Sequence, residues 1–159
     1  MLYTECQSPV GKLLLAASER GLTGVYLEEQ KHFKGSSGWQ RNDRYPILQQ
    51  TRVQLDAYFS GQRREFDVPL DMTEGTAFQQ AVWQVLCSVP FGSTASYAEI
   101  ARQIGNPAAV RAVGAANGRN PISIIVPCHR VIASSGALTG YAGGLNNKKL
   151  LLALEAKQG

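Results

Sequence analysis

Short apolar runs separated by polar turns dominate the first part of the chain. Residues 13–17 and 22–27 are largely apolar, and the polar stretch 18–21 lies between them. Two runs of this length, joined by a short turn that contains a glycine, predict a β-hairpin. Residues 3–5 are expected to add an edge strand. Residues 32–45 are rich in glycine, serine and charge, which predicts a loop.

Apolar residues then recur at helical intervals. Their spacing over 46–59 predicts a helix that Gly61 ends. A second helix is expected from Thr76, an acceptable N-cap residue, to about Ser88. Cys87 falls inside this helix, where a packing role is expected.

A helix-turn-helix pattern follows. Ser96 and Glu99 have the spacing of a capping box, which predicts a short helix ending near residues 104–105. Pro107 suits a first helical position, so a second helix is expected from there to residue 117. Alanine and glycine make this second helix thin-sided, and Arg111 is its only charge. The pair fits a DNA-binding unit, but also a helical hairpin that binds nothing.

The last predicted helix covers residues 146–157 and ends near a carboxylate. Its leucines are expected to bury one side; they are Leu150, Leu151, Leu152 and Leu154. Glu155 lies close to the C-terminal end, where the helix dipole disfavours negative charge. We therefore expect Glu155 to have a partner.

The apolar run 122–126 precedes the most reactive group of side chains. Pro127 follows the run and should end it as a strand, because proline cannot donate a ladder hydrogen bond. Cys128, His129 and Arg130 come next. A potential nucleophile is thus expected at a strand end, beside a base and a positive charge.

A free thiol has a pKa of about 8.5, so a nucleophilic cysteine needs a base or a positive neighbour. His129 and Arg130 could supply both. The alternative is that Cys128 is a small buried hydrophobe, and that His129 faces the other side of the strand, since neighbouring strand residues alternate. A Cys-His pair becomes a strong candidate only with a third, orienting group.

Composition favours an intracellular protein and is compatible with a polyanionic partner. The 159 residues carry a net charge of +4, and residues 76–159 hold seven lysines and arginines against two acids. A polyanionic partner would meet this excess, although a solvated basic face would give the same count. Three cysteines do not form a disulfide framework, which fits a reducing compartment. No membrane-length apolar run or leader pattern occurs, so a cytoplasmic protein is expected.

The residues around the cysteine resemble a known family. Pro-Cys-His-Arg-Val at 127–131, Ser-Ser-Gly at 134–136 and Tyr-Ala-Gly-Gly at 141–144 are similar to the O6-alkylguanine-DNA alkyltransferases, which are suicide DNA repair proteins. The resemblance is highly specific from about residue 75 to residue 155. Before that it is limited to Ser-Pro-Val-Gly at 8–11.

The resemblance implies a mixed α/β (α+β) protein of two domains. An N-terminal ribonuclease H-like domain would occupy residues 1–74, and a C-terminal winged helix-turn-helix domain would occupy 75–159. The expected activity is irreversible, single-turnover alkyl transfer from O6-alkylguanine, and also O4-alkylthymine, in double-stranded DNA to the protein's own cysteine. The protein is expected to act as a monomer without a cofactor.

Family motifs also imply residue roles. Cys128 would be the nucleophile, with His129 acting through a water and Glu155 orienting the imidazole. Asn120 would brace the turn before the cysteine, and Tyr97 would hydrogen-bond the guanine ring.

Further positions match DNA or pocket contacts. Arg111 would fill the stack that a flipped nucleotide leaves. The other matching positions are Asn106, Ser134, Val131 and Tyr141. Ala142 and Ser123 depart from the human-type pattern, which has serine and proline there, so pocket width stays open. Cys6 and His32 fall short of four zinc ligands, and no metal is expected.

The sequence also leaves open two alternatives from other functional classes. A non-catalytic module could bind alkylated bases, which alkyl transfer to Cys128 would exclude. A cysteine hydrolase could use Cys128 and His129, which turnover of an ester or peptide would reveal.

Overall fold

An antiparallel hairpin forms the centre of the first half of the molecule. In the computed structural model, which describes residues 1–158, β2 (Gly11–Ala17) pairs with β3 (Leu22–Tyr26), as the sequence predicts. β1 (Leu2–Ser8) pairs with β2 along its length, and the short β4 (Gln40–Arg41) pairs with β1 in parallel. The strand order is β3-β2-β1-β4. The strand expected at residues 3–5 is present within β1, but its start is not an edge, because β4 arises inside the expected loop and pairs with Leu2 and Tyr3.

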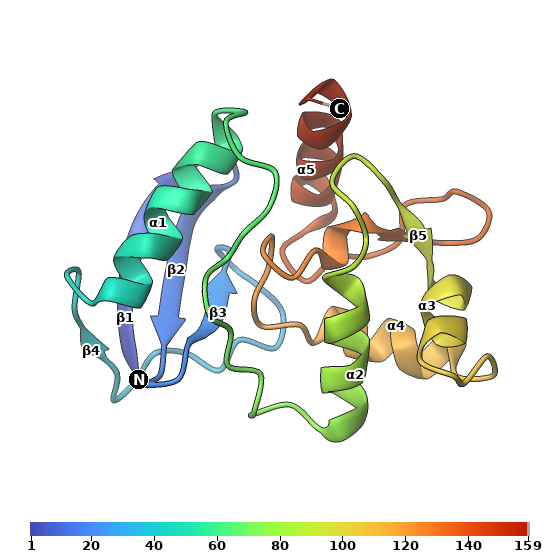
Figure 1. Cartoon of the computed structure of the whole chain (residues 1–159), viewed down its shortest axis with the longest axis horizontal. Coiled ribbons are helices and arrows are strands. Elements are labelled where there is room, and N and C mark those ends of the chain that lie inside the picture. Colours follow the sequence, from blue (N-terminus) through green and yellow to red (C-terminus); the bar gives the residue numbers. More distant parts are fainter. Residues whose placement is uncertain (159) are drawn as a thin grey trace.

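Helix α1 (Pro46–Phe59) lies across one face of this sheet (Figure 1). It has the predicted bounds: proline starts it, and Gly61, with φ 80°, follows its end. Its buried side carries Leu48, Thr51, Gln54, Leu55 and Tyr58. Two of these are polar and one is a phenol, so this helix brings hydrogen-bonding groups into the interior.

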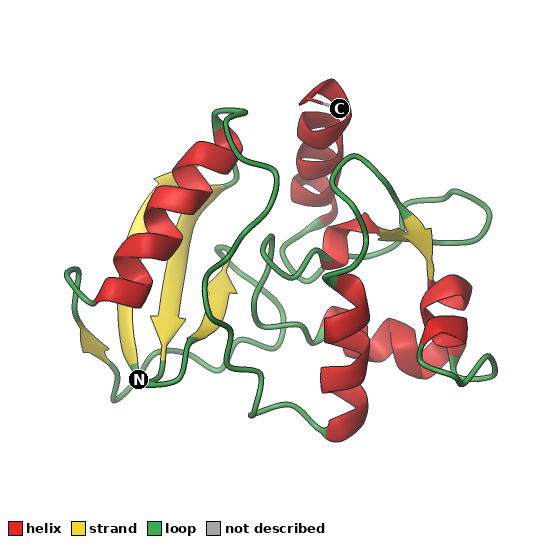
Figure 2. Ribbon diagram, viewed as in Figure 1, coloured by secondary structure: helices red, strands yellow, loops and turns green. Residues whose placement is uncertain are grey.

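The second half is mainly helical (Figure 2). α2 (Ala77–Leu86) begins at a capping box made by Thr76 and Gln79, and α3 (Tyr97–Gln103) begins at the predicted box of Ser96 and Glu99. α4 (Val110–Gly118) packs against both helices. The two-stranded sheet of β5 (Ala95–Ser96) and β6 (Val131–Ile132), which is parallel, and α5 (Leu145–Gln158) complete this half.

Two local expectations in this half were wrong. Residues 107–108 form a turn, and α4 begins only at Val110, because Asn106 accepts the amide of Ala109 and closes the turn first. Cys87 does not pack inside α2: it is the C-cap residue and is exposed.

The apolar run 122–126 is buried but is not a strand. Ile122 makes a single parallel bridge to Val25 in β3, and the chain then turns through Ile124, which has φ 73°. The amide of Val126 donates to the carbonyl of Ile122 at 3.0 Å, closing the turn. An apolar run of five residues fits a buried turn as well as a strand, and here local hydrogen bonds replace the ladder.

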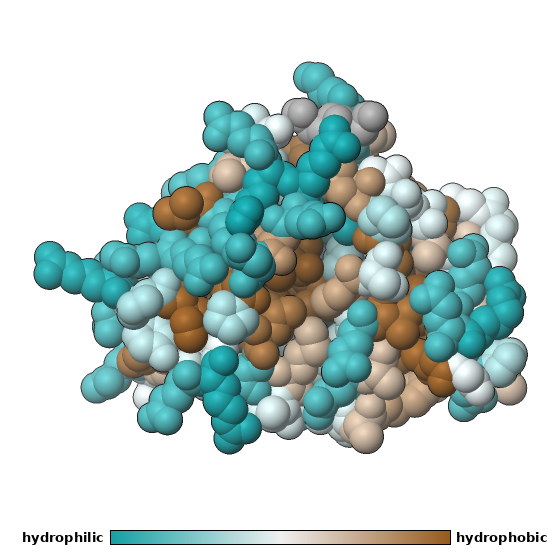
Figure 3. Space-filling model, in the orientation of Figure 1, coloured by the Kyte–Doolittle hydropathy of each residue, from teal (hydrophilic) through white to brown (hydrophobic). Residues whose placement is uncertain are grey.

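One hydrophobic core continues through both halves. It includes residues of the sheet and α1, such as Leu15 and Leu55, together with residues of α2 and α3, such as Val82 and Ile100. Figure 3 shows polar residues over most of one face, with hydrophobic residues between them toward the middle. The boundary at residue 75 stays a prediction, but the two halves are packed as one body.

Candidate active site

Cys128 begins a single turn of 3-10 helix, η1 (Cys128–Arg130), directly after Pro127. The expected strand end is therefore absent, and strand alternation does not place Cys128 and His129 on opposite faces. The turn is held by Asn120, whose Nδ2 donates to the carbonyl of Val126 at 2.8 Å. The Asn120 Oδ1 accepts the amide of Ile122 at 3.0 Å. The predicted bracing role of Asn120 agrees with these contacts.

The Cys128 thiol is buried, with 2% of the residue exposed, and polar groups lie near it. Burial raises the pKa of Cys128 to about 11, while a hydrogen bond from the Asn120 side chain and the charge of Lys148 act to lower it. A thiol with so high a pKa is protonated near neutrality, so nucleophilic attack requires a base.

His129 offers that base. Its Nε2 lies 2.7 Å from Oε2 of Glu155, and its Nδ1 is buried without a hydrogen-bond partner among residues 1–158. Burial lowers the pKa of His129, although Glu155 acts to raise it, so the imidazole is neutral near pH 7. An ionised Glu155 accepts the Nε2 proton, which leaves the lone pair on Nδ1.

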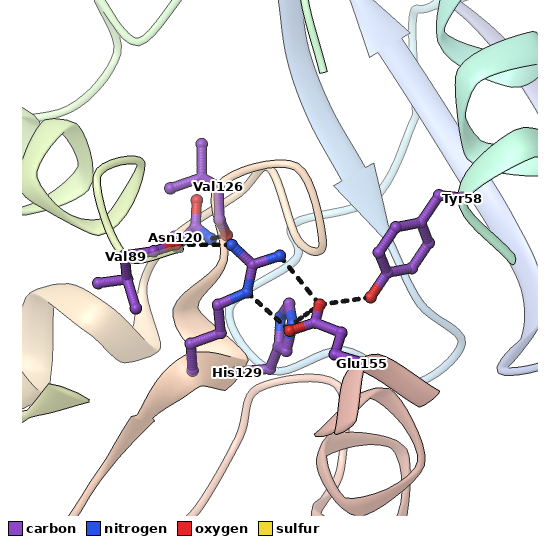
Figure 4. A network of polar contacts seen from close by, with 7 residues as sticks. Tyr58, Val89, Asn120, Val126, His129 and Glu155 are labelled. Atoms are coloured by element: carbon purple, nitrogen blue, oxygen red, sulfur yellow. Dashed lines mark hydrogen bonds and ion pairs between the residues drawn. The ribbon is translucent and has the colours of Figure 1, made fainter. Parts of the chain in front are cut away.

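Glu155 is the centre of a buried polar network (Figure 4). Its Oε2 accepts hydrogen bonds from Tyr58, His129 and Nη2 of Arg130, and its Oε1 accepts from Nε of Arg130 at 2.7 Å. Burial alone would raise the pKa of Glu155, but hydrogen bonds from His129, Arg130 and Tyr58 lower it to about 2. The expectation that Glu155 has a partner is confirmed.

Arg130 does not serve the thiol directly. Its Nε and Nη2 bind Glu155, its Nη1 donates to the carbonyl of Val89 at 2.7 Å, and its guanidinium lies over the ring of Phe91. Contrary to the expectation that Arg130 could hold the cysteine anion, its hydrogen bonds go to the carboxylate and a backbone oxygen.

Lys148 supplies the positive charge instead, and the sequence did not single it out. This lysine of α5 is fully buried, and its Nζ donates to the carbonyls of Val131 at 2.7 Å and Thr139 at 3.3 Å. Burial lowers the pKa of Lys148, and Cys128 acts to raise it. The sequence signal that could have revealed Lys148 is its position two helical turns before Glu155 in α5, because both side chains then lie on one face of the helix.

Comparison with known proteins identifies the family. The ribonuclease-like domain of 6-O-methylguanine DNA methyltransferase matches residues 1–72, and the DNA binding domain of the same family matches residues 77–157. The chain belongs to the 6-O-methylguanine DNA methyltransferase family. Both halves of the fold expected from the sequence, a ribonuclease-like domain and a DNA-binding domain, are confirmed.

Individual relatives are similar over nearly the whole chain. A methylated-DNA--protein-cysteine methyltransferase of Mycolicibacterium paratuberculosis is 50% identical, over 98% of this chain and 92% of the relative. One from Methanosarcina acetivorans is 49% identical over 98% of both chains. The crystal structure of Mycobacterium tuberculosis OGT in complex with DNA matches with a TM-score of 0.91 and 49% identity, covering 99% of this chain and 94% of that one.

Family-matched pocket residues lie around Lys148. The Tyr97 hydroxyl is 2.6 Å from Oγ1 of Thr139, whose carbonyl accepts from Lys148. Val131 is buried, and Tyr141 is buried with a pKa raised well above its usual value, first by burial and then by Cys128. Lys148 therefore joins the loop 133–144 to β6, and both Lys148 and Tyr141 interact electrostatically with Cys128.

The three residues expected to contact DNA lie outside this buried group. Arg111 on α4, Asn106 before α4 and Ser134 in the loop after β6 are all exposed. Exposure leaves each of them accessible to a duplex, whereas the reacting groups are hidden. A base must therefore leave the duplex to reach Cys128.

Two kinds of feature are absent from the described residues. Residues 1–158 contain no cluster of three or more histidine, cysteine, aspartate or glutamate side chains arranged to hold a metal. Within the same residues, none of the helices has the length and apolarity needed to cross a bilayer.

Proposed function

We propose that the protein repairs alkylated DNA by moving the alkyl group from O6 of guanine to Sγ of Cys128. The observation that carries this function is the buried Cys128, His129 and Glu155 group within a chain that belongs to the methyltransferase family in both halves. The thioether product has no route back to a thiol, so each protein molecule repairs one lesion.

The reaction is a displacement at the alkyl carbon. The thiol proton passes to Nδ1 of His129, through a water as the family resemblance implies, and the S–C bond forms as the C–O6 bond breaks. Glu155 stabilises the imidazolium that results. Tyr97, by resemblance, donates a hydrogen bond to the ring nitrogen of the departing guanine. The electron pair of the broken C–O6 bond stays on the guanine, which takes up a proton at that nitrogen and leaves as the neutral base.

Recognition uses the exposed side of α4. Its small residues allow close approach to a duplex, and Arg111 is the charge that this helix carries. We infer that Arg111 occupies the stack when the damaged nucleotide rotates out, while Asn106 and Ser134 contact the DNA backbone. Val131 and Tyr141 would line the base pocket.

Incubation with an oligonucleotide that contains O6-methylguanine, followed by peptide mass mapping, tests the function. We expect one methyl group per protein molecule, on the peptide that contains Cys128, and no further turnover. Cys128→Ala should abolish transfer, and Cys87→Ala, at the exposed end of α2, should leave it unchanged. Catalytic turnover, or methylation of Cys6 or Cys87 alone, would refute the proposal.

The same assay with O4-methylthymine tests the second expected substrate.

We infer a cytoplasmic, monomeric protein. The DNA partner and the three free cysteines both fit a reducing compartment that contains DNA.

A further inference from the structure

One side chain of the N-terminal half reaches the carboxylate of the active site. Tyr58 lies on α1, and its hydroxyl donates to Oε2 of Glu155 at 2.6 Å (Figure 4). Tyr58 is fully buried. Burial and the charge of Glu155 raise the pKa of Tyr58 far above its usual value, so the phenol stays protonated and acts as a donor.

Tyr58 and His129 share one oxygen atom. Both contact Oε2 of Glu155, at 2.6 Å and 2.7 Å respectively. The Tyr58 ring is held by edge contacts with Phe59 and with Phe91, an aromatic residue of the C-terminal half. A rigid donor on one side of a carboxylate oxygen restricts where that oxygen can lie for the imidazole on the other side.

We propose that Tyr58 is a positioning residue for alkyl transfer. Its hydroxyl holds Oε2 of Glu155 in line with Nε2 of His129, and so keeps the imidazole in the tautomer whose Nδ1 accepts the thiol proton. This inference rests on the proposed function. It gives the N-terminal half a direct part in the chemistry, beyond support of the fold.

Tyr58→Phe removes the hydroxyl and keeps the ring, and Tyr45→Phe is its matched control. Tyr45 precedes the same helix, and its hydroxyl donates to the carbonyl of Ser18 at 3.1 Å, within the N-terminal half. We expect Tyr58→Phe to slow transfer about tenfold, the effect of losing one hydrogen bond to a charged acceptor. The loss should be equal on methylated duplex and on free O6-methylguanine, because it concerns chemistry and not DNA binding. Tyr45→Phe should transfer at the wild-type rate.

The imidazole gives a readout that a purely structural role would leave unchanged. The chain has two histidines, His32 and His129. Nitrogen NMR of histidine-labelled protein therefore gives two sets of ring signals, and His32→Gln assigns them. We expect neutral His129 to carry its proton on Nε2 in the wild type and in Tyr45→Phe. In Tyr58→Phe the Nε2–H signal should move, and the population protonated on Nδ1 should increase.

The outcomes separate this inference from the proposed function. Absence of transfer by the wild type would refute the proposed function itself. If the wild type transfers, equal rates for Tyr58→Phe and Tyr45→Phe with an unmoved His129 spectrum would overturn the role of Tyr58. Thermal unfolding checks that each variant is folded. If Tyr58→Phe is not, Tyr58→Met, which lacks the hydroxyl but adapts to irregular space, replaces it under the same criteria.

Discussion

Replacing Glu155 with glutamine should cost the fold a measurable amount of free energy. The side chain of Glu155 is 1% exposed, so solvent does not screen its interactions with His129 and Arg130. Its pKa falls from 4.5 to about 2 in the folded protein. By linkage, that difference corresponds to about 3 kcal/mol of stability at neutral pH. A loss of stability of similar size, about 3–5 kcal/mol, is expected when one partner of a buried ion pair is removed.

Urea unfolding of the wild type and Glu155→Gln at pH 7 measures this difference. Since domains are stable by about 5–15 kcal/mol, the variant should still unfold cooperatively, at a lower midpoint. Glu5→Gln is the matched control. Glu5 binds Lys12 at 2.8 Å and Arg41 at 2.9 Å, but on the surface, where such pairs contribute less than about 1 kcal/mol.

The pH dependence identifies the carboxylate as the cause. A folded pKa below the unfolded one means that Glu155 stabilises the protein fully above its unfolded value of 4.5, and that this contribution is lost as the pH falls toward about 2. His129 also makes stability depend on pH, because burial lowers its pKa in the folded protein and the unfolded chain therefore binds its proton at a higher pH. The series is measured in a His129→Gln background to remove this contribution. There, Glu155 keeps its hydrogen bonds from Arg130 and Tyr58, so its pKa stays below the unfolded value. The gap caused by Glu155→Gln should therefore shrink as the pH falls below about 4.5. A gap below about 1 kcal/mol at pH 7, or one that does not change with pH, would refute the reasoning.

Two further variants test the site. Arg111→Ala should slow transfer at saturating duplex but not from free O6-methylguanine, because only duplex DNA has a stack to fill; single-turnover rates on both substrates decide, and equal losses would exclude this role. Lys148→Met should slow transfer at pH 7 and shift the pH–rate profile toward higher pH, because the Cys128 thiol loses the positive charge that lowers its pKa. A profile unchanged from the wild type would show that Lys148 serves only the carbonyls of Val131 and Thr139.

Several elements could be predicted because local chemistry defines their ends. The helix over residues 46–59 starts at a proline and is followed by a glycine with positive φ, and α3 starts at a capping box. Such signals act within one turn of helix, so they do not depend on the rest of the fold. The start of α4 could not be predicted in this way. The carbonyl of Asn106 accepts the amide of Ala109 and closes a turn around Pro107, and this turn competes with the helix.

The environment of the nucleophile could be predicted only in part. Glu155 was found because a carboxylate at a helix end needs a partner. The identity of those partners depends on tertiary packing, since Tyr58 comes from α1 and Arg130 turns away from the thiol. The turn at 122–126 was also hidden, because its apolar residues are buried equally well by a strand or by a turn.

Helix α5 shows why the charged positions were the hardest to interpret. Of its four expected core leucines only Leu151 is fully buried, while Lys148 and Glu155, on the same face, are at most 1% exposed. Burying two charges costs several kcal/mol each unless hydrogen bonds compensate, so a helix selected for stability alone would carry apolar residues there. The two charges lie seven residues apart and act on different groups: the cation acts on the Cys128 thiol and the anion on the His129 imidazole. Departure from the amphipathic pattern therefore coincides with the two positions that interact with Cys128 and His129, as expected if function opposes the local rule there.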